Sequence, residues 1–420
     1  MNHSKSWHWA AAVLSICVVV SLGASQPGEG ITDSEIVVGM SAPFSGTSRS
    51  LGIELYRGSM AYFTEINRRG GINGRTISVK AYDDGYQPEV AVKNTLRLML
   101  EDKVFTLFGY VGTPTVTRVL PLLKKHEGLH FRLFTSFTGA QPQREPPYDR
   151  LAVNFRASYR QETEGLVTNF RNIGRSRVAV LYQADAYGRS GWVGVRSALA
   201  SQNQKMVGEA TYARGAKYAD SLSRQVAILQ ESKPDVVIVI GAYEASAAFI
   251  RDARQAGLNV PIANVSFVGS ESMLELLRAE GTADGRDYTA NLVTSQVVPS
   301  YEDAAVPVVQ EYRELMAEHA ATVARPTLWN PDYRPLARSF VSLEGFLNAK
   351  LLVEVLRRLG PSPTRAQLAA AVASVQDLEL GMGHPVSFAA DRNQGSNAVF
   401  YTTVEEGKFV EIRDWKGWRK

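Results

Sequence analysis

Short apolar segments alternate with amphipathic segments along most of the chain, and this alternation predicts strands separated by helices. In the first half, the predicted strands are Glu35–Met40, Thr76–Tyr82 and Phe105–Tyr110. A helix is predicted around Gly58–Arg69, where Gly70 and Gly71 end it. A second helix is predicted to begin at Pro88, since proline suits the first helical turn.

The same order returns in the second half. The predicted strands are Arg177–Tyr182, Asp235–Ile240 and Pro261–Val268, and the predicted helices are Gly191–Ala200 and Ala245–Ala256. The strand at 235–240 lacks polar alternation, which is typical of a parallel strand buried on both faces. Alternating strands and helices indicate parallel sheets covered by helices. Because 420 residues exceed one typical core, we predict two doubly wound α/β lobes.

The first 25 residues have a different character. Lys5 precedes an apolar run, Ala10–Val20, which is too short to span a bilayer comfortably. Small residues follow it, including Ala24 and Ser25. This layout predicts a signal peptide over residues 1–25, with cleavage near residue 25 and export to the periplasm. An uncleaved membrane anchor is the alternative.

The chain has a single cysteine, Cys17, which lies inside this leader. A lipoprotein would keep such a cysteine as its first mature residue, but the bulky Ile16 before it favours plain cleavage. The mature protein then has no disulfide, thiolate nucleophile or cysteine-ligated metal. An exported protein without disulfides needs a sizeable packed core, which this length permits.

Charge and histidine spacing narrow the possible functions. The formal net charge is +4, from 46 basic and 42 acidic residues, without a dense Lys/Arg run, so a nucleic-acid surface is not expected. His126 and His130 have the i,i+4 spacing of metal ligands, but Gly128 between them breaks the helix that would align them. We therefore expect neither a metal site nor a cofactor.

Loops after strands carry the candidate binding residues, because ligands of doubly wound sheets bind beyond the carboxyl ends of the strands. Thr113 and Pro114 are predicted as the N-cap and first residue of a helix, whose free N–H groups attract a carboxylate or phosphate. Ser136 and Thr138 add hydroxyls after the strand that ends near Phe134. A helix cap without a ligand and simple turn chemistry are the alternatives.

The second half offers aromatic candidates. Tyr187 and Tyr243 each follow a strand and can stack on a ligand and hydrogen-bond it, although a buried structural tyrosine is the alternative. Ser266 has neither a Gly-x-Ser-x-Gly elbow nor a nearby histidine, which disfavours a hydrolase. Asp83 and Asp84 are adjacent and predict a turn rather than a catalytic pair. The sequence thus favours a binding protein over an enzyme.

Several motifs together resemble a known family. They are the opening strand and loop at Ile36–Gly46, the Asn-x-x-Gly-Gly-Ile-x-Gly stretch at Asn67–Gly74, and Tyr82-Asp83-Asp84. These are similar to the periplasmic binding proteins for leucine, isoleucine and valine, which serve ATP-binding-cassette importers. The resemblance covers nearly all of residues 32–412.

The resemblance implies two Rossmann-like lobes that close on a ligand like a hinged trap. Three crossovers would join them, near residues 152–157, 290–298 and 384–388. Lobe 1 would hold residues 32–153 plus 294–385, and lobe 2 residues 154–293 plus 386–415.

The resemblance also assigns ligand contacts. Thr113 would hold the ligand carboxylate, and Ser136 and Thr138 would hold its α-amino and carboxylate groups. The other implied ligand-binding residues are Val111, Tyr187, Tyr243 and Ser266.

Two positions depart from the family pattern, because Leu51 falls where the family has an aromatic contact and Ser266 where it has an acidic one. A serine cannot neutralise a buried ammonium, so the ligand should lack a free α-ammonium or satisfy it through another residue such as Glu244. Aromatic surface around the cleft is expected from Tyr110, Phe137, Tyr187 and Tyr243.

The function that this resemblance implies is extracytoplasmic solute capture. The protein would be a monomer that binds an amino acid or a related carboxylate or amide and delivers it to the membrane permease of an ATP-binding-cassette importer. A sensing protein that reports the same ligand to a membrane receptor or sensor kinase is the alternative.

Overall fold

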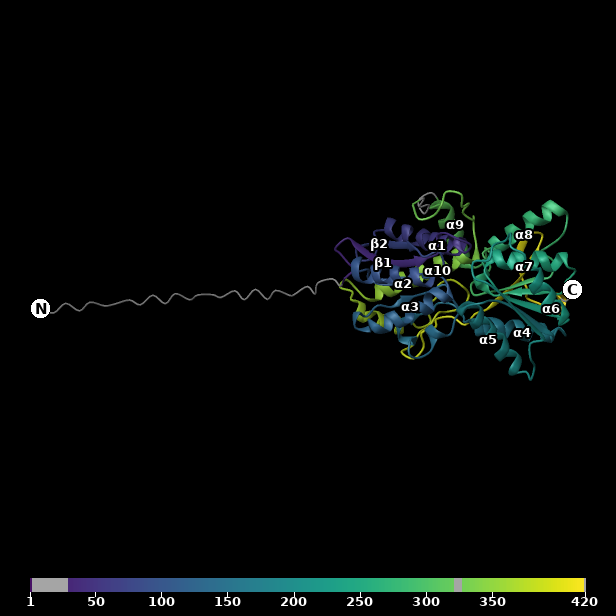
Figure 1. Ribbon diagram of the computed structural model, residues 1–420. Helices are drawn as coiled ribbons and strands as arrows, with labels where there is room; N and C mark the ends of the chain where they lie inside the picture. Colours follow the sequence, from purple (N-terminus) through teal and green to yellow (C-terminus); the bar gives the residue numbers. More distant parts are fainter. Residues whose placement is uncertain (2–28, 321–326, 419–420) are drawn as a thin grey trace.

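The computed structural model describes residue 1, residues 29–320 and residues 327–418, which form two lobes lying side by side (Figure 1). The predicted signal segment at 1–25 lies outside the described residues, apart from Met1. Among the described helices, none combines the length and the apolar character needed to cross a membrane.

Five parallel strands form the sheet of lobe 1, in the spatial order β2-β1-β3-β4-β5. They are β1 (Glu35–Ala42), β2 (Thr76–Asp83), β3 (Thr106–Phe108), β4 (Leu133–Phe134) and β5 (Ala152–Val153). The residues of β3 and β4 are all buried, as expected of parallel strands covered by helices on both faces.

Helices from two distant parts of the sequence cover this sheet. They are α1 (Arg49–Arg68), α2 (Pro88–Leu96), α3 (Thr113–Lys125), α9 (Pro307–Glu318), α10 (Phe340–Arg358) and α11 (Leu368–Ala373). Helix α10 packs on α1 (Figure 1). Glycines allow this close crossing, since a Cβ on Gly58 would lie 1.8 Å from the carbonyl oxygen of Ser342 and one on Gly345 would lie 2.2 Å from that of Leu55.

Seven strands form the sheet of lobe 2, in the order β12-β11-β10-β9-β8-β6-β7. They are β6 (Val178–Gln183), β7 (Gly208–Tyr212), β8 (Val236–Ile240), β9 (Ile262–Asn264), β10 (Leu292–Gln296), β11 (Phe400–Glu405) and β12 (Lys408–Glu411). The first five are parallel, and β11 and β12 add antiparallel pairs at one edge. The residues of β8 are all buried, which confirms its prediction as a buried parallel strand.

Helices also flank the second sheet (Figure 1). They are α4 (Tyr159–Asn172), α5 (Ala186–Ala200), α6 (Ser223–Glu231), α7 (Tyr243–Gln255), α8 (Ser270–Asp284) and α12 (Trp415–Trp418). Short 3-10 turns lie at Glu127–Leu129, Pro142–Arg144, Asp149–Leu151, Ser266–Val268 and Arg365–Gln367, and a π-helical turn at Arg97–Glu101. The predicted fold class of two doubly wound α/β lobes is confirmed.

The chain passes between the sheets three times: after β5, after β10 and before β11. The first and third passages lie side by side, because the N–H of Asn154 donates to the carbonyl of Asn393 at 2.8 Å and the N–H of Gly395 donates to that of Asn154 at 2.8 Å. The lobe boundaries given above stay a prediction.

Several element boundaries differ from the predictions, and two of them affect the candidate site. Helix α1 begins at Arg49, nine residues before Gly58, so Leu51 lies in a helix rather than in a loop. Strand β9 ends at Asn264, and Ser266–Val268 is a 3-10 turn. The backbone N–H of Ser266 donates to the Glu162 carboxylate at 2.8 Å, and Gly269 is left-handed with φ 75°, so the chain leaves the sheet there.

Candidate functional site between the lobes

Thr113 and Thr138 lie together at the edge of the lobe 1 sheet. Their hydroxyl oxygens are 2.6 Å apart, and both residues are buried. The prediction of Thr113 as an N-cap is wrong, since Gly112 holds that place and Thr113 is the first helical residue. Gly112 has φ 101°, and a Cβ there would lie 2.1 Å from the Tyr86 ring, so a side chain that could cap α3 does not fit at this position.

The two loops that follow β3 and β4 run next to each other. The N–H of Phe137 donates to the carbonyl of Tyr110 at 2.7 Å, and the N–H of Gly112 donates to that of Phe137 at 3.2 Å. Val111 and Phe137 thereby form a parallel bridge. Ser136 is buried in this loop, and its hydroxyl has no hydrogen-bond partner.

Lobe 2 presents Tyr187 from the first turn of α5. Asp185 caps this helix by accepting the N–H of Tyr187 at 2.9 Å, so the tyrosine is fixed at the end of β6. The Tyr187 hydroxyl donates to the carbonyl of Gly241 at 3.3 Å, within its own lobe. The hydroxyl of Tyr187 is therefore already bonded, and the face of its ring is the part left to contact other side chains.

Aromatic rings from both lobes meet between the sheets. Phe267 of lobe 2 lies 5.4 Å from Phe137 and 6.1 Å from Tyr86 of lobe 1, measured between ring centroids. It also lies 4.6 Å from Tyr187 of its own lobe. The Tyr187 ring in turn lies 5.4 Å from that of Tyr159. These five buried residues form an aromatic cluster between the two sheets.

Tyr110 does not belong to this aromatic cluster. Its hydroxyl lies 3.0 Å from that of Thr95 on α2, in a separate core cluster of lobe 1. The expectation that Tyr110 adds aromatic surface to the cleft is therefore wrong, because its side chain packs under α2 and α3.

Tyr243 and Glu244 begin α7 in lobe 2. The Tyr243 side chain packs near Gly269, where burial raises its pKa. The Glu244 carboxylate accepts the N–H of Tyr218 at 3.1 Å, so it is bound to its own lobe. Among the described residues, this pair makes no hydrogen bond to Thr113, Ser136 or Thr138.

A buried charge cluster lies between Phe137 and Ser266. Arg156, in the first passage between the lobes, is 1% exposed, and its guanidinium lies 4.9 Å from the centroid of the Phe137 ring. Its Nη2 donates to Glu162 of α4 at 3.3 Å and also contacts the Ser266 hydroxyl, while its Nη1 lies 3.5 Å from Glu344 of α10. Arg156 thus joins both lobes at their junction.

The two carboxylates of this cluster differ in their partners. Glu162 accepts the N–H of Ser266 at 2.8 Å, the Ser266 hydroxyl at 3.0 Å and the Ser295 hydroxyl at 2.7 Å, in addition to Arg156. Glu344 is buried and pairs with Arg156. Burial raises the pKa of Glu344 to about 7, and the negative charge of Glu162 acts in the same direction.

A second buried arginine adds positive charge. Arg144 donates to main-chain carbonyls of Ala140 at 2.6 Å and Arg156 at 3.1 Å, and to the amide oxygen of Gln394 at 2.8 Å. Burial, reinforced by the nearby Arg156, lowers its pKa to about 9, which leaves it cationic at neutral pH. The junction thus has two cations, one fully bonded carboxylate and one carboxyl that titrates near neutrality.

Some buried polar groups at the junction of the lobes have no hydrogen-bond partner. They include the Ser136 hydroxyl and Arg156 Nε. Buried polar atoms are rarely left unpaired, because each one costs about 1–3 kcal/mol. Their grouping between the lobes is typical of a site that a polar ligand completes.

The sequence did not single out Arg156, Glu162, Glu344 or Phe267. A weak signal existed for Arg156, which lies between the apolar residues Phe155 and Ala157. A charged residue is seldom buried unless it is paired or functional. The glutamates lie on amphipathic helices where acidic residues are common, so the pattern gives no reason to select them.

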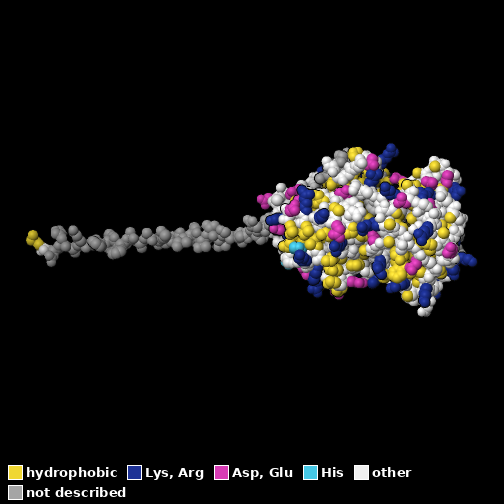
Figure 2. Space-filling model, viewed as in Figure 1, with side chains coloured by type: hydrophobic (Ala, Val, Ile, Leu, Met, Phe, Trp, Pro, Cys, Tyr) yellow, Lys and Arg dark blue, Asp and Glu magenta, His cyan; other side chains and the backbone are white. Residues whose placement is uncertain are grey.

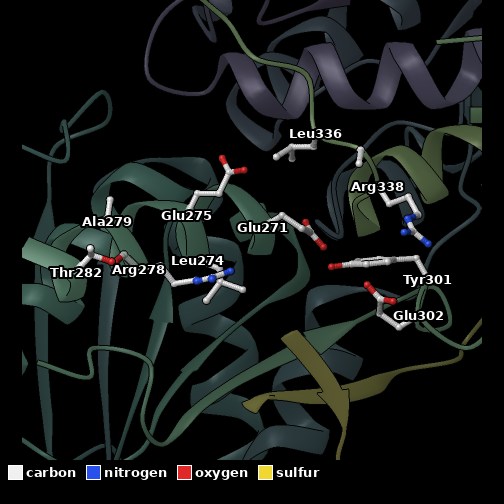
Figure 3. Close-up of a pocket in the computed structure, with 11 residues that line it drawn as sticks. Glu271, Leu274, Glu275, Arg278, Ala279, Thr282, Tyr301, Glu302, Leu336 and Arg338 are labelled. Carbon is white, nitrogen blue, oxygen red and sulfur yellow. The ribbon is translucent and has the colours of Figure 1, made fainter. Parts of the chain in front are cut away.

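A cavity lies where α8 meets the segments before α10, with a volume of about 480 Å³ (Figure 3). Glu271 and Tyr301 point toward one another in it, and Glu275, Arg278 and Arg338 surround them. Burial raises the pKa of Glu271 to about 7. This cavity has mixed charge and contains none of the predicted ligand residues.

The visible outer face shows no concentration of either charge. Figure 2 shows Lys and Arg side chains interspersed with Asp and Glu over both lobes, and a notch where the lobes meet. His126 and His130 flank the 3-10 turn after α3 rather than sharing a helix face. Among the described residues, Glu65, Glu318 and His319 lie close enough to share an ion, but Glu65 is already bonded to Arg68 at 2.7 Å and Arg69 at 2.5 Å.

Comparisons with known proteins agree with this architecture. The family model described as periplasmic binding protein matches residues 35–408. An amino acid binding protein of Pseudomonas aeruginosa is 25% identical over 288 residues, covering 67% of this chain and 72% of the relative. Leu/Ile/Val-binding protein homolog 7 of Brucella abortus is 23% identical over 411 residues, covering 94% and 95%.

A solved structure gives the same result. It is the crystal structure of a possible leucine/isoleucine/valine-binding protein from Rhodopirellula baltica SH 1, with a TM-score of 0.80 and 27% identity. The match covers 93% of this chain and 99% of that one. The ligand roles of Val111, Thr113, Ser136, Thr138, Tyr187, Tyr243 and Ser266 stay a prediction.

Proposed function

Because the chain belongs to the periplasmic binding protein family, we propose that it is an extracytoplasmic solute-binding protein for an ATP-binding-cassette importer. It captures a small ligand between its lobes and delivers that ligand to the membrane permease. The ligand is an amino acid or a related carboxylate or amide. The observation that carries this proposal is the group of buried, unpartnered polar atoms between the lobes.

The proposed binding residues come from both lobes. Thr113, Ser136 and Thr138 provide hydroxyls at the carboxyl edge of the lobe 1 sheet. Tyr187 provides an aromatic face from lobe 2. Hydroxyls can donate to a carboxylate or an amide oxygen, so this edge suits either group.

Capture follows from the way in which the two lobes are connected. Three chain passages join them, so the lobes can rotate apart and expose the cleft without breaking either sheet. A ligand that contacts both lobes stabilises the closed arrangement, because it has these contacts only there. The closed form is then the one that a permease could distinguish from the open form.

A thermal-shift screen tests the proposal. The compounds are amino acids, aromatic and aliphatic acids, short amides and dicarboxylates, each added to the purified protein. A true ligand at 100 times its dissociation constant should raise the free energy of unfolding by about 2.7 kcal/mol. Calorimetry with the best compound should then give one site per chain. If no compound of any class stabilises the protein, the proposal is wrong.

A further inference from the structure

We propose that Arg156 binds the anionic group of the ligand, and that this ligand is an aromatic carboxylate without an α-ammonium group. The inference rests on the proposed function and names its ligand class. It starts from the place of Arg156 in the cleft, where the guanidinium lies over the Phe137 ring and contacts Ser266. Phe137 belongs to lobe 1 and Ser266 to lobe 2, so Arg156 lies where the two ligand-facing loops meet.

The guanidinium of Arg156 has an N–H donor that is not used in a hydrogen bond. An arginine carries five N–H donors. The bonds of Arg156 go from Nη1 to Glu344, and from Nη2 to Glu162 and Ser266. Its Nε has no partner although the side chain is 1% exposed. The Ser136 hydroxyl, one residue before Phe137, is likewise buried and unpartnered. A carboxylate is the group that such donors prefer, since charge-assisted hydrogen bonds are about twice as strong as neutral ones.

The charges around the cleft disfavour an ammonium. Glu162 is the carboxylate beside Ser266, but three N–H or O–H donors and Arg156 already occupy its oxygens. Glu344 has a pKa of about 7 and is therefore partly neutral at physiological pH. Arg144 and Arg156 stay cationic. A ligand ammonium would be repelled by two positive charges and would find no free carboxylate among these groups. A ligand anion would be attracted by the same two positive charges.

The walls of the cleft favour a flat ring. Phe137 and Tyr86 line it from lobe 1, and Phe267 and Tyr187 from lobe 2. When the lobes separate, the contacts of Phe267 with Phe137 and Tyr86 are lost and both aromatic surfaces face water. A ligand ring placed between them restores this burial, and aromatic pairs add about 0.5–1.5 kcal/mol beyond area alone.

A matched pair of ligands tests the charge argument. 3-Phenylpropanoate and L-phenylalanine share a ring and a carboxylate and differ in the ammonium. We expect calorimetry to show at least about 10-fold tighter binding of 3-phenylpropanoate, because the ammonium of L-phenylalanine would be buried without a partner. Benzoate should likewise bind more tightly than cyclohexanecarboxylate. Tighter binding of L-phenylalanine or L-leucine than of the acids would overturn the inference and leave the proposed function intact, whereas no binding of any compound in the screen would overturn the proposed function itself.

Two variants test Arg156. Arg156→Lys keeps the positive charge but removes Nε and the fork, so binding of the aromatic acid should weaken by about 10-fold or more. Glu344→Gln removes the carboxyl that competes with the ligand for Arg156. In the wild-type protein, affinity for the acid should fall between pH 6 and pH 8 as Glu344 ionises, whereas in Glu344→Gln it should stay level. Arg118→Gln, an exposed arginine on α3, serves as the control and should match the wild type.

The readouts separate a binding role from a purely structural one. Benzamide, the neutral counterpart of benzoate, should show no such pH dependence in either protein. If Arg156→Lys fails to fold, the pH profile of Glu344→Gln still decides the question. Unchanged acid affinity in folded Arg156→Lys, or an identical pH profile in Glu344→Gln and the wild type, would overturn the assignment of Arg156.

Discussion

Helices α1 and α10 cross so closely that a single methyl group at Gly58 should destabilise lobe 1. The Cβ of an alanine there would lie 1.8 Å from the carbonyl oxygen of Ser342 and 2.6 Å from its carbonyl carbon. Neither atom can rotate away, because both belong to the main chain of α10. The Ser59 hydroxyl also bonds the carbonyl of Gly345 at 2.9 Å, so separating the helices would break this contact as well.

Two opposing effects set the size of the change. Alanine favours a helix over glycine by about 0.8–1.0 kcal/mol, which alone would stabilise the protein. Overpacking of a well-packed core costs about 1–3 kcal/mol, and this clash with main-chain atoms lies at or above the upper end. We therefore expect Gly58→Ala to lower the free energy of unfolding by about 2 kcal/mol. For a lobe of this size, such a loss lowers Tm by roughly 4–8 °C.

Urea unfolding measures this loss. Trp329 packs on Tyr56 of α1, with ring centroids 6.0 Å apart, so it contributes a signal from lobe 1 to the total tryptophan fluorescence. Gly128→Ala is the matched control, because a Cβ there meets no atom within 4 Å and the residue is exposed. Its stability should stay within about 0.5 kcal/mol of the wild type. If Gly58→Ala equals or exceeds the wild type in stability, helix propensity outweighs the clash and the close crossing is refuted.

Three further predictions concern the cleft, the pH dependence and export. Thr113→Ala and Thr138→Ala should each weaken ligand binding by about 1 kcal/mol or more, and unchanged calorimetric affinity in both would contradict their assignment. The pKa of buried Asp84 is raised by burial from its usual 3.8 to about 7, so the stability that its neutral form gives is present at pH 4 and lost as the pH rises through 7. Asp84→Asn should therefore raise the free energy of unfolding at pH 8, by up to roughly 4 kcal/mol, and change it little at pH 4; equal effects at both pH values in urea titrations would rule this out. Intact-mass analysis of periplasmic protein should show the loss of about 25 residues, and a mass that retains Met1–Ala24 would exclude cleavage, while a lipid adduct on Cys17 would identify a lipoprotein.

The sequence predicts the two lobes well because buried strands and helix ends produce characteristic patterns among neighbouring residues. The unbroken apolar run of β8 and the paired glycines after α1 depend on neighbouring residues alone. The start of α1 was missed by nine residues, since its first turns are buried between the lobes and do not show a polar face.

The candidate site was predicted less completely, because its parts come from distant segments. Arg156 meets Ser266 across 110 positions and Glu344 across 188, and no periodicity relates such pairs. Tyr110 and Phe137 both follow strands and are alike in sequence, yet Tyr110 packs under α2 while Phe137 faces the other lobe. The direction of a side chain in an irregular loop depends on backbone angles that the residue types do not set.

The pairing of α1 with α10 also constrains the order in which the protein can be assembled. About 290 residues separate the starts of these helices, so at roughly 5–20 residues per second α1 leaves the ribosome some 15–60 s before its partner exists. The sheet of lobe 2 is likewise completed by β11 and β12, near the end of the chain. Neither half can therefore reach its final form while synthesis is under way. A nascent chain that lacks these partners stays incompletely folded for longer, and a chain that has not completed its fold can still be threaded across a membrane.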